Sequence, residues 1–269
     1  MHRDLIRALL DDAGATSVLD AGCGPASLLR DLDGSDRALY GFDLTPEMVA
    51  AGRRAMAARG HPPTRVWEGS VTDPEAFRCP DEPAAGFEAA LCCGVFPHIE
   101  EEHDAAVVEH LRDAVEPGGT VVIEARNALF ALFTLNRYSW QLFRDDLMDV
   151  GQLRALARAD DEEGLSLALG EIEARFRTDL PPLRRGREVE PGYDEVLSRT
   201  HHPHALADVA RGAGLRDVRI LYFHYHALPP MVEHHVPELA RRAALAMEDP
   251  TDDRGLVMAS AFLLTGRAP

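Results

Sequence analysis

The sequence predicts an α/β fold: a doubly wound, mostly parallel sheet of seven strands, with a mainly helical insertion after the fifth strand. Short apolar runs alternate with helical patterns from the N-terminus to about residue 124, which is typical of strand–helix–strand units. About 75 residues then separate the fifth apolar run from the next such unit near His202, more than a loop without structure of its own normally contains. We therefore expect an inserted element at that point.

Each predicted strand is an apolar run bounded by polar or turn residues, and the fifth follows a Pro-Gly-Gly turn. The predicted strands are residues 16–20, 37–43, 64–69, 87–93, 119–123, 217–223 and 256–266.

The helices between the strands show amphipathic spacing or clear end signals. Thr45 can cap a helix that has Pro46 at its first position, and Gly60 follows its last turn. The predicted helices are residues 5–10, 26–32, 45–60, 101–115, 205–211 and 237–247.

Three segments follow from these elements. Residues 1–125 form the α/β core, residues 126–200 form the helical insertion, and residues 201–269 complete the core with the last two strands. Within the insertion, apolar residues recur at helical spacing, while residues 178–195 are polar, Pro-rich and predicted to be loop. Since the insertion is the largest element outside the core pattern, we expect it to act as a substrate lid.

Composition excludes several classes of protein. With 45 acids against 28 bases the net charge is -17, which disfavours nucleic acid as a partner. All basic residues are arginine, so a lysine Schiff base and a P-loop lysine are excluded. No apolar run is long enough to span a membrane and no secretory signal is evident, so we expect a cytoplasmic protein. The four cysteines form no CxxC pair and are expected to be reduced thiols.

The segment VLDAGCGPA, residues 18–26, indicates a ligand at the end of the first strand. Gly22 and Gly24 allow the backbone to approach a ligand at a helix start, but the third glycine of a dinucleotide fingerprint is missing. Asp20 before them would repel a diphosphate and attract an ammonium group. Asp43 lies 23 residues later, about the separation at which a carboxylate reaches ribose hydroxyls. The pattern favours a ligand with a ribose and a cationic group.

Four segments in order, VLDAGCGPA, GFDLTPEM, FEAALCCGVFPHI and LRDAVEPGGTVVIE, give the chain its resemblance to a known family. It resembles the class I S-adenosylmethionine (SAM)-dependent methyltransferases of Rossmann-like fold that act on small molecules. The resemblance implies SAM as cofactor. It also implies that Asp20, Gly22, Cys23 and Gly24 line its methionine end, that Asp43 and Leu44 hold the ribose, and that Ser70, Val71 and Cys93 flank the adenine and the sulfonium.

The chain departs from the family at Ser70, where an aspartate often accepts a hydrogen bond from adenine. A hydroxyl or backbone groups would serve here instead.

Candidate catalytic residues are fewer, because a positioned sulfonium needs a general base only for an acceptor such as a hydroxyl. His98, just beyond the fourth strand, is the first candidate, although it could also orient the following helix. His201 and His202 could face the substrate or cap a helix, and their spacing matches no closed zinc site, so we predict no metal. Tyr138, in a polar trio on an otherwise apolar segment, fits a lid or a surface turn equally.

We expect methyl transfer to a small molecule, first to oxygen and next to nitrogen. An arginine-rich, lysine-free composition is associated with GC-rich genomes, in which such enzymes often serve specialised metabolism. A protein or peptide methyltransferase and a non-catalytic SAM-binding partner subunit remain as alternatives, with a nicotinamide oxidoreductase behind them. The apolar stretch FALFTL fits a homodimer contact as well as a lid.

Overall fold

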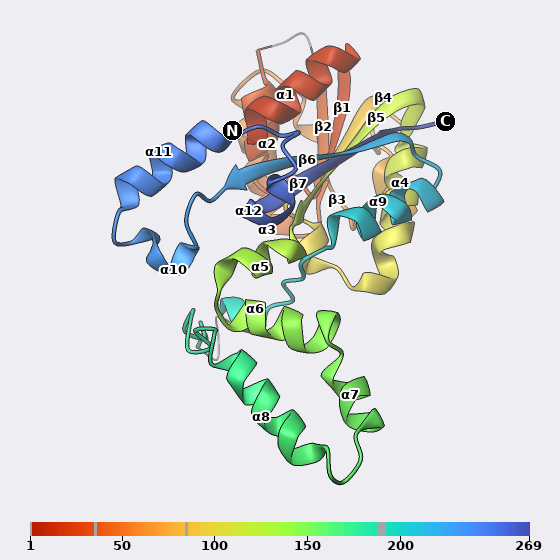
Figure 1. Ribbon diagram of the computed structural model, residues 1–269. Helices are drawn as coiled ribbons and strands as arrows, with labels where there is room; N and C mark the ends of the chain where they lie inside the picture. The colour runs from red at the N-terminus through yellow and green to blue at the C-terminus, as the bar shows by residue number, and fades with distance from the viewer. Residues whose placement is uncertain (1, 35–36, 84–85, 188–191) are drawn as a thin grey trace. The chain divides into compact units, whose positions relative to one another are not determined.

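The computed structural model describes residues 2–34, 37–83, 86–187 and 192–269, and these fall into two compact units (Figure 1). Unit 1 contains Met1–Arg126, Leu197–Phe223 and Ala261–Pro269. Unit 2 contains Asn127–Val196, the segment predicted as an insertion, together with His224–Ser260, which the sequence pattern had assigned to the core. Each unit is described below by itself.

The sheet has seven strands in the order β3-β2-β1-β4-β5-β7-β6, so the predicted fold class is confirmed. Strands β1 to β5 pair in parallel with their neighbours, whereas β7 runs antiparallel to β5. Parallel pairing brings the carboxyl ends of β1, β2, β4 and β5 to one edge of the sheet, where such folds bind ligands. The strands are β1 (Ser17–Ala21), β2 (Ala38–Asp43), β3 (Val66–Glu68), β4 (Phe87–Cys92), β5 (Val115–Arg126), β6 (Arg216–Tyr225) and β7 (Ala259–Arg267).

The helices of unit 1 come mainly between the strands, as the alternating pattern predicts. The α-helices are α1 (His2–Ala13), α2 (Ser27–Leu32), α3 (Pro46–Ala57), α4 (Asp104–Ala114) and α9 (Pro203–Gly212). Short 3-10 turns are η1 (Pro63–Arg65), η2 (Pro74–Phe77), η3 (Phe96–His98) and η4 (Glu101–His103).

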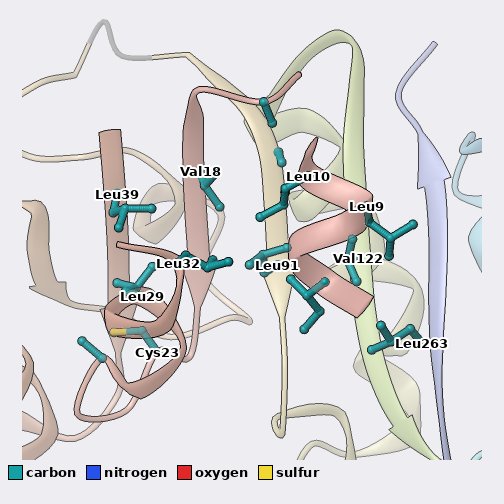
Figure 2. Close-up of a cluster of buried hydrophobic side chains, with 14 of the residues drawn as sticks. Leu9, Leu10, Val18, Cys23, Leu29, Leu32, Leu39, Leu91, Val122 and Leu263 are labelled. Carbon is teal, nitrogen blue, oxygen red and sulfur yellow. The ribbon is translucent and has the colours of Figure 1, made fainter. Parts of the chain in front are cut away.

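One hydrophobic cluster of unit 1 lies on the face of the sheet beneath α1 and α2 (Figure 2). Leu10 of α1 and Leu29 of α2 are fully buried in this cluster, which also contains Leu91 of β4 and Val122 of β5, partners in the β4–β5 ladder. Burial of each such side chain contributes on the order of 2 kcal/mol. This packing holds α2 behind the glycine turn.

Unit 2 is mainly helical, with the helical spacing that its sequence predicts. Phe143, Leu165 and Phe176 pack around the buried Trp140 and Leu169. Its elements are η5 (Ala128–Phe130), α5 (Ala131–Thr134), α6 (Arg137–Gln141), a π-helical turn η6 (Leu142–Leu147), α7 (Val150–Leu156), α8 (Glu162–Glu173), η7 (Tyr193–Glu195), α10 (Pro230–Glu233), α11 (Pro237–Met247) and α12 (Gly255–Met258). Within the predicted loop 178–195, residues 188–191 lie outside the described residues.

Two predicted element boundaries are wrong. The last strand was expected from residue 256, but Gly255–Met258 form the helical turn α12. The reason is Asn127, whose buried side-chain amide donates hydrogen bonds to the carbonyls of Gly255, Leu256 and Ala259 at 3.3, 2.9 and 2.8 Å and so draws them together.

The fifth strand was expected to start at residue 119 but begins at Val115. It continues through the glycines because Gly118 and Gly119 exchange backbone hydrogen bonds with Ala268, and Val115 pairs with Phe87.

Thr45 precedes α3, as predicted, but its side chain makes no capping hydrogen bond. Its amide instead donates to the Asp43 carboxylate at 3.0 Å.

Across the described residues, no helix is both long enough and apolar enough to cross a membrane.

Gly41 of β2 tests how tightly the glycine turn packs on the sheet. A Cβ at Gly41 would lie 2.9 Å from both Cβ and Sγ of Cys23 and 3.0 Å from Cδ1 of Leu29. We expect Gly41→Ala to lower the free energy of unfolding by about 1–3 kcal/mol in urea denaturation, through overpacking.

Gly164→Ala is the control, because a Cβ at this α8 position meets no atom within 4 Å. It should leave the free energy of unfolding unchanged or raise it by up to about 1 kcal/mol. Equal effects of the two substitutions would show that the turn does not pack tightly against β2.

Candidate functional site

The turn after β1 is built on two glycines in the left-handed region. Gly22 has φ 81° and Gly24 has φ 53°. A Cβ at Gly22 would come within 2.3 Å of Cγ2 of Val95, so both the backbone angle and the space require glycine. The amides of Gly22 and Cys23 donate to the Phe42 carbonyl at 2.8 and 2.9 Å, which ties the turn to β2.

Asp43 joins this turn to the one that follows β2. Its Oδ2 accepts from the Gly24 amide at 2.8 Å and its Oδ1 accepts from the Thr45 amide at 3.0 Å. A carboxylate has about four lone-pair directions, so it can still accept from two hydroxyls. The geometry fits a ribose at this position.

Asp20 is a buried acid with an unsatisfied oxygen. Its side chain is 2% exposed, and its Oδ1 has no hydrogen-bond partner among the described residues. Burial, together with the carboxyl groups of Asp43 and Glu124, raises the pKa of Asp20 to about 7. A buried carboxyl without a partner is costly, and a cation is the group that would offset this cost. The ammonium of SAM fits this requirement.

Glu124 of β5 is an acid at this edge that the sequence analysis missed. Burial raises its pKa, while Arg126 opposes the shift. A signal was available, because Glu124 interrupts the apolar run VVIEA near the end of a parallel strand, as Asp20 and Asp43 end theirs.

The residues expected beside the ribose and the adenine differ in exposure. Leu44 is 69% exposed although apolar, and nearby Met48 is 42% exposed, which suits a surface that an aromatic base would cover. Ser70 Oγ lies 2.8 Å from the Thr72 hydroxyl and accepts from the Thr72 amide at 3.3 Å. Val71 is buried. The Ser70 hydroxyl is thus engaged in its own turn.

The cysteines near the turn are free thiols. Cys23 and Cys92 are buried and Cys93 is partly buried. Burial and the neighbouring acid Asp20 raise the pKa of all three thiols. They are therefore neutral, small apolar groups and not nucleophiles.

His98 is exposed at the end of η3, beyond the carboxyl end of β4. Its Nδ1 lies 2.8 Å from the Leu197 carbonyl. Because a carbonyl can only accept, Nδ1 carries the proton and the Nε2 lone pair of the neutral ring remains available.

His201 is buried in unit 1, and its amide donates to the Arg126 carbonyl at 2.7 Å. Neither ring nitrogen has a hydrogen-bond partner among the described residues, and Nε2 lies 3.6 Å from Asp104 Oδ2. Arg199 donates to both oxygens of Asp104 at 3.0 and 2.8 Å. Burial alone would raise the pKa of Asp104, but His201 and Arg199 hold it below its ordinary value.

The other two candidate residues lie in different settings. His202 is exposed, and its Nδ1 accepts from the Ala205 amide at 3.4 Å at the start of α9. Tyr138 belongs to unit 2, where its hydroxyl accepts from Arg137 at 2.8 Å. Unit 1 therefore brings together Asp20, Asp43 and the glycine turn. It also contains His98, which follows β4, and His201, whose amide is bonded to the end of β5. It does not contain Tyr138.

Asp20 makes the stability of the ligand-free protein depend on pH. The folded-state pKa is raised to about 7, so folding loses stability as the pH rises from about 4, where the unfolded chain ionises, to about 7. We expect Asp20→Asn to raise the free energy of unfolding by about 4 kcal/mol at pH 8, because it removes the buried charge. At pH 4 the substitution should have almost no effect.

Urea denaturation at pH 8 and at pH 4 measures the change in the free energy of unfolding. Glu109→Gln is the control, because it neutralises an exposed acid on α4. A destabilised Asp20→Asn protein at pH 8 would mean that the carboxylate has a partner in the folded state.

Comparisons with known proteins agree with this geometry. Residues 18–119 match the model of a family described as a methyltransferase domain. A search of curated proteins finds no match to the chain.

Solved structures share the fold at low sequence identity. The methyltransferase domain of a bacterial CtHen1 has a TM-score of 0.53 and 14% identity, over 99% of this chain and 96% of that one. A SAM-dependent methyltransferase from Archaeoglobus fulgidus has a TM-score of 0.50 and 15% identity, over 98% of this chain and 94% of that one. An O-methyltransferase family protein from Burkholderia thailandensis has a TM-score of 0.52 and 15% identity, over 99% of this chain but 55% of that one. These likenesses show the fold.

The matched residues 18–119 run from β1 into β5 and contain the glycine turn, Asp20 and Asp43. The buried Asp20, whose Oδ1 has no hydrogen-bond partner among the described residues, fits a cofactor with a cationic group, and the fold is shared with the matched structures. Residues 18–119 therefore match a methyltransferase domain, and the protein is an enzyme that transfers methyl groups with S-adenosylmethionine as its cofactor.

Proposed function

We propose that this methyltransferase acts on a small molecule, first at a hydroxyl oxygen and next at nitrogen, with His98 as the general base. The observation that supports this proposal is the hydrogen bond between His98 Nδ1 and the Leu197 carbonyl, which leaves Nε2 as an exposed proton acceptor. A hydroxyl acceptor must lose its proton during transfer, and an imidazole beyond the carboxyl end of β4 can take it.

SAM supplies, when bound, an electrophilic methyl group on a sulfonium. The chain would then hold the cofactor through Asp20 at the ammonium, through Asp43 and Leu44 at the ribose, and through Gly22, Cys23 and Gly24 along the methionine part. Ser70, Val71 and Cys93 would flank the adenine and the sulfonium. Alignment of acceptor and methyl supplies most of the rate in such a reaction, so positioning is the main task of these residues.

A small acceptor fits the charge of the chain better than a nucleic acid does. The net charge of -17 repels a phosphate backbone. In this proposal residues 126–200 serve as the lid over the acceptor, with Tyr138, His201 and His202 as further polar contacts. The likeness to an O-methyltransferase family protein supports this proposal at the level of the fold and does not name the acceptor.

A labelling experiment tests the proposal. The protein is incubated with methyl-labelled SAM and either a small-metabolite pool or a protein and peptide fraction, and labelled products are identified by mass spectrometry. We expect label in O-methylated small molecules. His98→Asn should slow transfer by about a hundredfold, the typical contribution of a general base, and should flatten the pH profile of the rate.

His204→Asn is the control, because His204 is also exposed but lies on α9. Both variants should bind SAM as the wild type does. Label confined to polypeptides would support a protein methyltransferase. SAM binding without transfer to either fraction would support a non-catalytic partner subunit. A His98→Asn protein that transfers methyl groups as fast as the wild type would show that His98 is not the general base.

A further inference from the structure

Two acids of the cofactor edge share one face of the sheet. Leu91 of β4 is the ladder partner of both Asp20 on β1 and Val122 on β5, and registered neighbours point to the same face. Glu124 lies two residues beyond Val122, so its side chain lies on that face and closer to the carboxyl edge. Asp20 and Glu124 thus flank β4 from either side, within electrostatic reach of each other.

In the described part of the chain, Arg126 partly compensates Glu124, but no basic group is among those that shift the pKa of Asp20. The charged groups that act on Asp20 are Asp43 from β2 and Glu124 from β5, both acids. Arg126 acts on Glu124 from the same strand, and the Gly94 amide also favours the charged form of Glu124. The other titratable groups that face Asp20 are the neutral thiols of Cys23, Cys92 and Cys93.

A second observation indicates a ligand for these acids. Asp20 is 2% exposed and its Oδ1 has no partner, which leaves a buried acceptor beside the glycine turn. One ammonium would satisfy Asp20, and a second acid on the same face then suits a second positive charge. SAM carries two such charges, the ammonium and the sulfonium, whereas the product S-adenosylhomocysteine carries only the ammonium.

We propose that Glu124, together with Asp20, determines the preference of the site for the cationic SAM over its neutral product S-adenosylhomocysteine. The two ligands share the adenine, the ribose and the amino acid part. A side chain that changes the ratio of the affinities for SAM and S-adenosylhomocysteine therefore acts on the sulfonium charge. The loss of that charge on methyl transfer then weakens the hold on the product and favours its release.

Proton release accompanies the binding of the charged ligand. The pKa of Asp20 is about 7, so about half of the Asp20 carboxyls are protonated at pH 7 before binding. A cation beside the pair favours the ionised form and expels that proton. S-adenosylhomocysteine carries the same ammonium, so its binding expels the Asp20 proton as well.

Isothermal titration calorimetry of the wild type at pH 7 measures the proton release. Titrations in phosphate and in Tris, whose ionisation enthalpies differ, give the number of protons released. We expect about half a proton for SAM, for S-adenosylhomocysteine and for sinefungin, which carries an ammonium in place of the sulfonium, because all three bring the amino acid ammonium to a carboxyl that is half-protonated.

The same titrations on Glu124→Gln test the residue. At pH 8 we expect SAM affinity to fall roughly tenfold, as for the loss of one charge pair in a partly buried site, while S-adenosylhomocysteine affinity changes less than about twofold. Glu109→Gln on the exposed face of α4 makes the same change of charge and should alter neither affinity.

Equal loss of affinity for both ligands in Glu124→Gln would overturn the proposal, because Glu124 would then serve the common part of the ligand or the fold. The absence of proton release when SAM binds to the wild type would overturn it as well, because Asp20 would then not meet the cation, and this measurement needs no variant to fold. Neither readout depends on the methyl acceptor, so failure here is distinct from failure of the proposed function.

Discussion

The hydrogen bonds from the Gly24 and Thr45 amides to the Asp43 carboxylate are the interaction on which the cofactor site depends. They join the turns that follow β1 and β2, two neighbouring parallel strands. One carboxylate therefore satisfies two turn amides that would otherwise need water and still presents lone pairs outward. Gly22 then completes the arrangement, because the turn passes too close to Val95 for any side chain.

Much of this arrangement could be predicted from sequence because it is local. The glycines and Asp20 stand within five residues, and the helix behind them begins at once, so the βαβ pattern places them without knowledge of distant contacts. The strand-end position of Asp43 follows from the same pattern. The sheet could be predicted as well, since seven apolar runs with turn signals leave few topologies for a parallel core.

Features that depend on distant parts of the chain could not be predicted in this way. Val115–Gly118 join β5 because Ala268, about 150 residues later, pairs with the glycines and because Val115 pairs with Phe87. Residues 255–258 form a turn and not a strand because Asn127 holds their carbonyls. The tautomer of His98 depends on the carbonyl of Leu197. The ring nitrogens of His201 have no hydrogen-bond partner among the described residues, and the nearby Asp104 accepts from Arg199 instead. Glu124 is different, since its sequence signal was present and unused.

We expect Asp20 and Asp43 to select a ligand that carries both a ribose and a positive charge. Calorimetric measurement of ligand binding tests this expectation most directly. The wild type should bind SAM and should not bind NAD, and Asp43→Asn should weaken SAM binding by at least about tenfold without loss of the folded state in a thermal melt. Binding of NAD alone, or unchanged SAM affinity in a folded Asp43→Asn protein, would contradict the account.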